Sequence, residues 1–164
     1  MLIDKLNTFS WETALTATAI SDVIDLLPVS GAIGAGATGG PSANTTRDIG
    51  TGQPLYLHIL VTTTLDSSGE AATLTVSLES DDAAALNTSA TVHLTLAQVA
   101  EATLAAGYWI AKGIAIPAGN YQRYLGVRYT VGTENFTSGK VSAWLSNNRY
   151  DDKTYESGWV SGIN

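Results

Sequence analysis

Apolar and polar residues alternate with a period of two along much of the chain, most clearly over 123–131 and 140–145. The apolar positions of the first run are Leu125, Val127, Tyr129 and Val131, and those of the second run are Val141, Ala143 and Leu145. A period of two predicts β-strands with one buried face. Glycines begin and end the segment 132–139 between the runs, so we expect a hairpin with a long loop. We take this hairpin as the centre of an antiparallel β-sandwich.

Further strands are expected on both sides of this hairpin. The run over 55–65 is nearly continuous in apolar character, which favours a central strand covered on both faces. Alternation over 73–78 and 91–96, and shorter runs over 14–27 and 108–116, bring the count to about eight strands. This spacing predicts an all-β, jelly-roll-like antiparallel β-sandwich.

At most one short helix is expected, near 96–106. Thr95-Leu-Ala-Gln98 matches a capping box, and alanine-rich sequence follows it as far as Gly107. An irregular loop is the competing interpretation of the same residues.

The 164 residues are enough for one domain with a substantial core. We expect a sandwich domain over 1–146 and a C-terminal tail over 147–164, where the sequence becomes polar and aromatic without a period. Within the domain, 31–46 is rich in glycine and small residues and predicts a flexible loop or arm.

Composition argues against several classes of partner and chemistry. The net charge is −7 and only eight Lys and Arg are present, so no cationic footprint for nucleic acid or for an anionic membrane is expected. The absence of cysteine excludes disulfides and thiolate chemistry. The N-terminus lacks the long apolar core of a signal peptide, so we expect synthesis in a cytoplasm.

Residues 34–39 match the Gly-x-Gly-x-x-Gly pattern of dinucleotide-binding loops. That pattern requires a helix whose N-terminus faces the pyrophosphate, whereas Gly40-Pro41-Ser42 and polar residues without helical period follow here. We therefore predict no nucleotide site and no cofactor.

The titratable residues suggest no reaction centre. His58 and His93 each fall within an expected strand, where we expect them to face solvent or to be hydrogen-bonded within the sheet. A calcium loop at 79–82 lacks further oxygen ligands after Asp82, so a solvated acidic turn is favoured. A glycosidase pair could come from four carboxylates in polar turns, where ordinary pKa values are expected, and only their separation decides it. These four are Asp66, Glu70, Glu101 and Glu134.

Large aromatic side chains near the C-terminus have three interpretations. They either pack on the protein's own core, anchor a protein partner, or stack on a sugar. The residues concerned are Trp144, Tyr150, Tyr155 and Trp159.

Three stretches, over 116–119, 123–129 and 136–145, together with the opening in which 1–27 leads to 47–57, resemble the capsid cement or decoration proteins of tailed bacteriophages. The resemblance covers most of the chain, and its motifs are structural. It implies a jelly-roll sandwich on the outer capsid surface of the virion, bridging neighbouring major capsid proteins, often as a homo-oligomer (dimer or trimer). The family has no catalytic residues to carry over, and we predict no catalytic or metal site.

Partner contacts are expected in the glycine-rich arm and in the tail. The candidate contact residues are Ile33, Arg47, Tyr150, Tyr155, Trp159 and Val160. The alternative function is a carbohydrate-binding β-sandwich module of a phage fibre or another receptor-binding protein. A third, a hydrolase on a jelly-roll scaffold, requires converging carboxylates or a metal triad that the spacing does not suggest.

Overall fold

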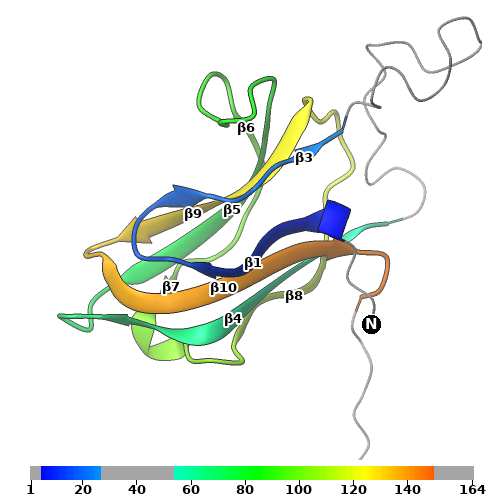
Figure 1. The fold of residues 1–164 in the computed structure, drawn as a ribbon. Coiled ribbons are helices and arrows are strands. Elements are labelled where there is room, and N and C mark those ends of the chain that lie inside the picture. Colours follow the sequence, from blue (N-terminus) through cyan, green and yellow to red (C-terminus); the bar gives the residue numbers. More distant parts are fainter. Residues whose placement is uncertain (1–4, 27–53, 150–164) are drawn as a thin grey trace, which may run out of the picture.

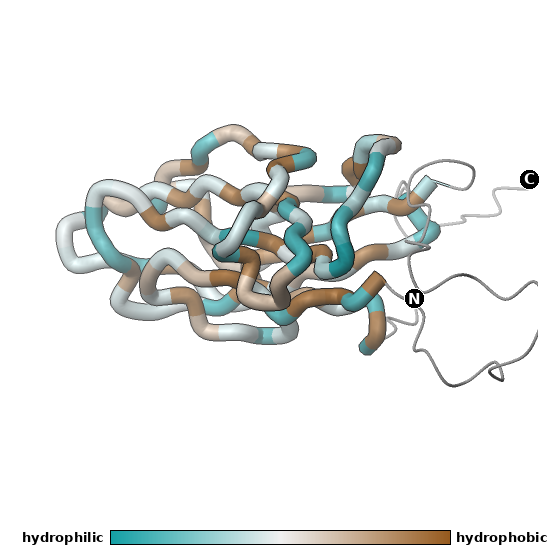
Figure 2. Tube along the Cα trace, turned by 90° about the horizontal axis from the view of Figure 1, so that it is seen from above, coloured by the Kyte–Doolittle hydropathy of each residue, from teal (hydrophilic) through white to brown (hydrophobic). Residues whose placement is uncertain are grey.

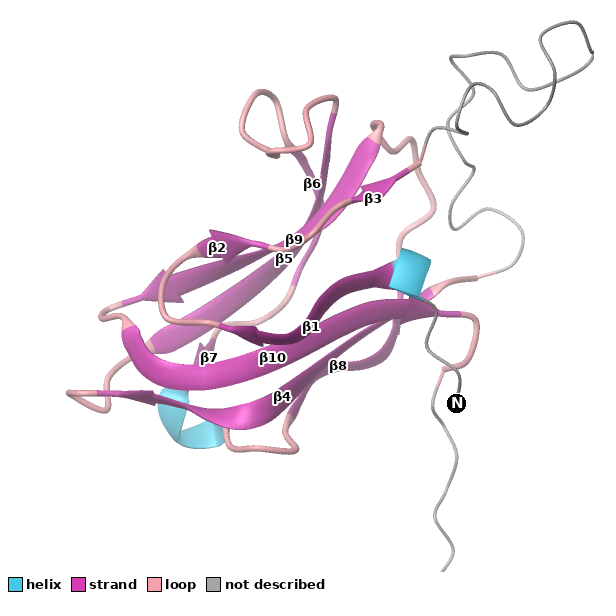
Figure 3. Cartoon of the chain, in the orientation of Figure 1, coloured by secondary structure: helices cyan, strands magenta, loops and turns pink. Residues whose placement is uncertain are grey.

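The computed structural model describes residues 5–26 and 54–149, which form two antiparallel sheets packed as a sandwich (Figures 1 and 3). This confirms the all-β prediction. The strands are β1 (Thr8–Ala14), β2 (Ala19–Ile20), β3 (Ile24–Asp25), β4 (Tyr56–Ser67), β5 (Thr73–Asp81), β6 (Thr91–Thr95), β7 (Val99–Ala100), β8 (Trp109–Ala115), β9 (Tyr124–Gly132) and β10 (Phe136–Ser146). The described residues also form two 3-10 turns, η1 (Lys5–Asn7) and η2 (Glu101–Thr103).

The four-stranded sheet has the order β1-β10-β4-β8. The six-stranded sheet has the order β2-β9-β5-β6, with β3 also paired to β9 and β7 to β5. Strand β4 lies between β10 and β8, and Leu57, His58 and Ile59 are all buried, so both of its faces are covered there. The expectation of a central strand over 55–65 is confirmed for this half of β4.

The expected hairpin over 123–145 is wrong, because β9 and β10 belong to different sheets. Residues 133–135 carry the chain from one sheet to the other. Alternation correctly identified the buried face of each strand, but two inner faces of a sandwich produce the same pattern as two paired strands. The connection is also shorter than expected, since Gly139 lies inside β10 at φ +127°, where the register with β4 shifts.

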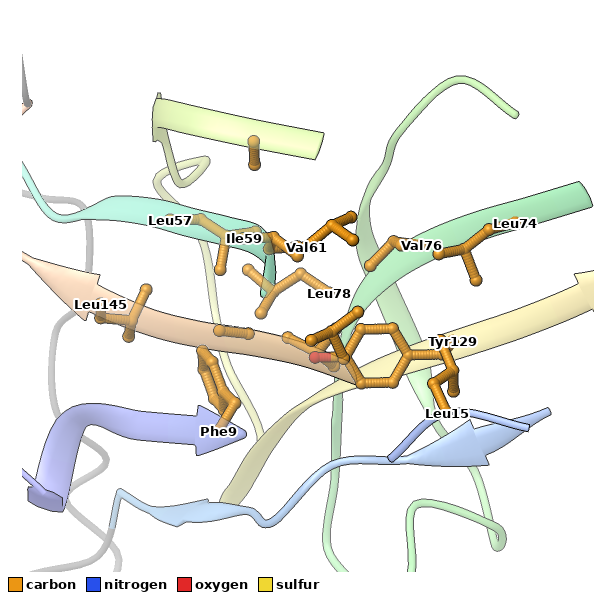
Figure 4. Close-up of a cluster of buried hydrophobic side chains, with 14 of the residues drawn as sticks. Phe9, Leu15, Leu57, Ile59, Val61, Leu74, Val76, Leu78, Tyr129 and Leu145 are labelled. Atoms are coloured by element: carbon orange, nitrogen blue, oxygen red, sulfur yellow. The ribbon is translucent and has the colours of Figure 1, made fainter. Parts of the chain in front are cut away.

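The core fills the space between the sheets (Figure 4). Strand β9 contributes Leu125, Val127 and Tyr129, and strand β5 contributes Leu74, Val76 and Leu78, as the alternation predicted. Along the strands, hydrophobic and hydrophilic positions alternate (Figure 2). The Tyr129 hydroxyl donates to Ser10 Oγ at 3.1 Å, and burial raises the pKa of Tyr129 to about 12. A phenol held neutral at the sheet interface therefore fixes β9 against β1.

The predicted helix near 96–106 is replaced by β7 and the single turn η2. No side chain caps η2, and Gln98 donates from Nε2 to Thr73 Oγ1 at 3.0 Å. Val99 pairs with Leu74 at the edge of the six-stranded sheet. Pairing with β5 has overridden the local helical preference, which is weak over so short a segment.

The two ends of the sandwich differ in how the chain is connected. At the end we call the terminal end, the described chain stops at Lys5, Leu26, Pro54 and Arg149 (Figure 1). The register agrees, because Ser146 pairs with Tyr56 and Thr8 pairs with Trp144 at this end of the four-stranded sheet. At the opposite end, the turn end, lie the β4–β5 turn, η2 and the β9–β10 crossover.

Candidate functional site

The six predicted contact residues, Ile33, Arg47, Tyr150, Tyr155, Trp159 and Val160, lie outside the described residues. The glycine pattern at 34–39 and the whole arm over 31–46 lie outside them as well, and of the predicted tail only 147–149 is described. The candidates within the described residues are the polar and aromatic clusters and the exposed apolar side chains of the sandwich itself.

His58 is fully buried in β4 and is held at both ring nitrogens. Its Nδ1 accepts a hydrogen bond from the Gly113 backbone N–H at 3.2 Å, and its Nε2 lies 2.9 Å from the Asn148 carbonyl oxygen. An N–H donor at Nδ1 and a carbonyl acceptor at Nε2 require the neutral imidazole with its proton on Nε2. The ring thus joins β8 and the segment after β10 to β4, as expected for a hydrogen-bonded histidine within a sheet.

Two tryptophans pack on His58 at the outer face of the four-stranded sheet. Trp144 stacks on the imidazole with ring centroids 5.4 Å apart, and Trp109 meets both rings edge-on at 6.2 and 5.8 Å. Trp144 is only 4% exposed, and its Nε1–H has no acceptor. For Trp144, packing within its own domain is therefore the interpretation that holds, because so covered a ring offers no platform for a sugar.

His58 is expected to make stability depend on pH. Burial lowers its pKa below 6.5, so folding favours the neutral ring. The contribution is complete above pH 6.5 and is lost as the pH falls towards the lowered pKa. Urea unfolding should therefore show lower stability at about pH 5.5 than at about pH 7.5.

His58→Gln removes this titrating group and is expected to reduce the difference between the two pH values. Burial also lowers the pKa of His93, so His93→Gln should reduce the pH difference as well, and the two variants together measure the share of each histidine. An unchanged difference in His58→Gln would contradict the assignment to His58.

Glu79 and Asp81 do not form the solvated acidic turn that the sequence suggested, because they are 4% and 0% exposed. Burial alone would raise the pKa of Asp81, but the backbone N–H groups of Thr88, Ser89 and Ala83, among others, donate to its carboxylate and together lower it. This carboxylate folds the β5–β6 loop.

Arg128 ties the same loop to the outer face of the six-stranded sheet. Its Nε donates to Glu79 Oε2 at 2.8 Å, and its Nη2 donates to the Leu86 carbonyl oxygen at 2.6 Å. Leu86 is fully buried and lies over Gly126, where a Cβ would come within 2.6 Å of Leu86 Cδ1. Arg128 therefore holds Leu86 in place over the outer face of the six-stranded sheet.

Arg128→Met is expected to lower the free energy of unfolding by about 2–3 kcal/mol, because it leaves the Glu79 carboxylate buried without a cation. Urea unfolding followed by tryptophan fluorescence measures it. The double variant Glu79→Gln/Arg128→Met should recover most of the loss, and Arg123→Met, which breaks a solvent-exposed pair with Asp25, should have little effect. Equal losses in both arginine variants would refute this account.

At the turn end, Glu101 and Glu134 meet on one serine. Both carboxylates contact the Ser67 hydroxyl. Glu101 also accepts the N–H groups of Ser67 and Ala72 at 2.7 and 3.2 Å. Glu134 accepts those of Gly69 and Ala71, both at 3.0 Å. Residues far apart in sequence thus close the β4–β5 turn against η2 and the β9–β10 crossover.

These contacts also determine what the carboxylates do chemically. Hydrogen bonds lower the pKa of both carboxylates, so the expectation of ordinary carboxylates was wrong here. The Ser67 hydroxyl has one proton and donates to one carboxylate at a time, while backbone N–H groups of Ser67 and Ala72 on Glu101, and of Ala71 and Gly69 on Glu134, lower the pKa of each. A glycosidase needs one carboxylic acid with a raised pKa as its proton donor. Because both pKa values shift the opposite way, this pair fits a structural clamp.

A cavity of about 230 Å³ adjoins the clamp, and Asp66 and Glu70 line it together with Glu101. Within the part of the chain that the structure describes, no group of three His, Cys, Asp or Glu side chains is placed to hold a metal ion. His93 does not belong to the cluster of Ser67, Glu101 and Glu134. Its Nε2 is hydrogen-bonded to Ser80 Oγ at 2.7 Å.

Three large apolar side chains are exposed on the described surface: Leu6 at 79%, Trp11 at 59% and Val92 at 53%. Trp11 lies in β1, at an edge of the four-stranded sheet where the pairing with β10 is irregular. The next residue, Glu12, has φ +46° and donates its N–H to Ser142 Oγ. Leu6, Trp11 and Val92 are therefore the candidates, among the described residues, for apolar contact with a partner. The sequence analysis did not single them out.

Among the described residues, no helix is long and apolar enough to span a membrane. A comparison with family models finds a match to the family Bbp16 over residues 9–145. The search of curated proteins finds no match.

Proposed function

The chain belongs to the Bbp16 family, a phage-related family, and we propose that it is a structural virion protein that binds the outer surface of a phage capsid. In this role the sandwich bridges neighbouring major capsid proteins and stabilises the shell, as a dimer or trimer and without catalytic turnover. The observation that carries the proposal is the family match over 9–145, which spans nearly the whole sandwich from β1 to β10.

The polar chemistry of the described residues supports this role. Its buried polar clusters, around Glu79, Asp81 and Glu101, are used to fix loops and strand ends. A bridging protein needs a rigid body and many small interface contributions repeated over a shell, and it needs no activated group. The negative net charge also suits a protein that lies on a shell without binding nucleic acid.

Capsids from which this protein has been removed provide the test. Purified protein should co-sediment with them, saturate at a fixed ratio to the major capsid protein, and restore the heat resistance that the stripped capsids have lost. Capsids that still carry the protein serve as the control, because their sites are filled. Absence of binding, together with full heat resistance of virions lacking the protein, would refute the proposal.

A carbohydrate-binding role is the second candidate, and the exposed ring of Trp11 is the observation that favours it. Sugars stack on exposed aromatic faces. Under this alternative a glycan array gives micromolar binding that is lost in Trp11→Ala, whereas the capsid-binding proposal predicts no glycan signal.

A further inference from the structure

We propose that the terminal end of the sandwich faces the capsid shell and that the turn end points away from it. The inference rests on the proposed function and adds to it an orientation and a contact surface. The partner is the major capsid protein beneath that end.

The first argument is the position of the chain connections. The described chain stops at four points, and all four lie at the terminal end (Figure 1). Segments 1–4, 27–53 and 150–164 therefore all join the sandwich on the same side. A protein that bridges shell subunits gains contact area when every additional segment starts from the surface nearest the shell.

The second argument is the apolar surface at the terminal end. Leu6, in η1 beside Lys5, is the most exposed large apolar side chain described. Its side chain supplies apolar area at this end that a packed contact with the shell would bury.

The third argument is that the turn end is already closed. Glu101 and Glu134 accept the backbone N–H groups of Ser67, Gly69, Ala71 and Ala72, so these donors are not available to a partner. The stretches 66–72, 101–107 and 132–135 contain four carboxylates and no Lys or Arg. Many copies arrayed on a shell with such ends outward would repel other particles, which favours dispersed virions.

The absence of cysteine allows a direct test. Single-cysteine variants Lys5→Cys and Asn147→Cys place a thiol at the terminal end, and Ser68→Cys and Asn135→Cys place one at the turn end. All four positions are exposed in the free protein. The rate of reaction with a maleimide-polyethylene glycol reagent is measured for each variant free and bound to stripped capsids.

Binding is expected to slow labelling at Lys5→Cys and Asn147→Cys by about tenfold or more, because a packed interface excludes the reagent, and to leave the other two within about twofold. Reagent attached beforehand at the terminal end should block co-sedimentation, whereas reagent at the turn end should not. Protection of the turn end instead, or equal labelling at both ends of protein that binds, overturns the orientation alone. Failure of the unlabelled protein to co-sediment overturns the proposed function and the orientation together.

Discussion

Gly139→Ala is expected to lower the free energy of unfolding by about 3–5 kcal/mol, which is a large share of the stability of a domain this size. Gly139 has φ +127°, in a region that L-residues rarely adopt. A Cβ there would lie 2.7 Å from Leu65 Cα and 2.9 Å from the Thr64 carbonyl oxygen. These atoms belong to β4, so the clash is relieved only by separating the two central strands of the four-stranded sheet. Urea unfolding at neutral pH measures the loss.

Two other glycines separate strain from steric clash. Gly107 has φ +89°, and a methyl group added there would meet no atom within 4 Å, so Gly107→Ala should lose about 1 kcal/mol from backbone strain alone. Gly119→Ala has neither strain nor clash and should be close to neutral. If Gly139→Ala lost no more stability than Gly107→Ala, close packing of β10 on β4 would not be the cause.

Gly139 also shows where prediction from sequence fell short. The sequence predicts Gly139 as the end of a hairpin loop, because glycine usually marks turns. In the fold it is a position inside β10 where the backbone of β4 approaches closely, which is the other role of glycine in a strand. Sequence alone does not distinguish the two, since the difference depends on which strand pairs with β10.

Local patterns predicted what depends on one strand at a time. The alternation in β5 and β9 identified the buried faces, and the continuous apolar run at the start of β4 identified the half of that strand that is covered on both sides. The partner of each strand was not predictable in this way, because any two strands with one apolar face produce the same pattern in a sandwich. For this reason the sequence predicted a hairpin between β9 and β10, where the structure has a crossover between the sheets.

The polar clusters were missed for a related reason. Ser67, Glu101 and Glu134 are brought together by the ends of three separate connections, and nothing in the local sequence of any one of them indicates the others. Asp81 is an exception, because the groups that it binds are close to it in sequence. Its partners Thr88 and Ser89 are only seven and eight residues away. A carboxylate that precedes a short polar loop often folds that loop by accepting its backbone N–H groups.

Trp144→Ala is expected to lower the free energy of unfolding by about 3–5 kcal/mol, because it removes a buried ring and opens a cavity beside His58 and Trp109. Trp144→Phe should lose much less, about 1 kcal/mol, since phenylalanine keeps an aromatic ring there and removes a buried N–H that has no acceptor. Denaturation with urea, followed by the fluorescence of the remaining tryptophans, gives both values.

This pair of variants tests the packing of Trp144 within its own domain. A ring that packs on its own domain affects unfolding first, and capsid binding only through the loss of folded protein. A ring that anchors a partner affects binding while stability is unchanged. Trp11→Ala is the matched comparison, because Trp11 is 59% exposed and its removal should change stability by less than about 0.5 kcal/mol. Stable Trp144→Ala protein that no longer binds capsids would show that the outer face of the four-stranded sheet contacts the shell, and would also move the contact surface away from the terminal end.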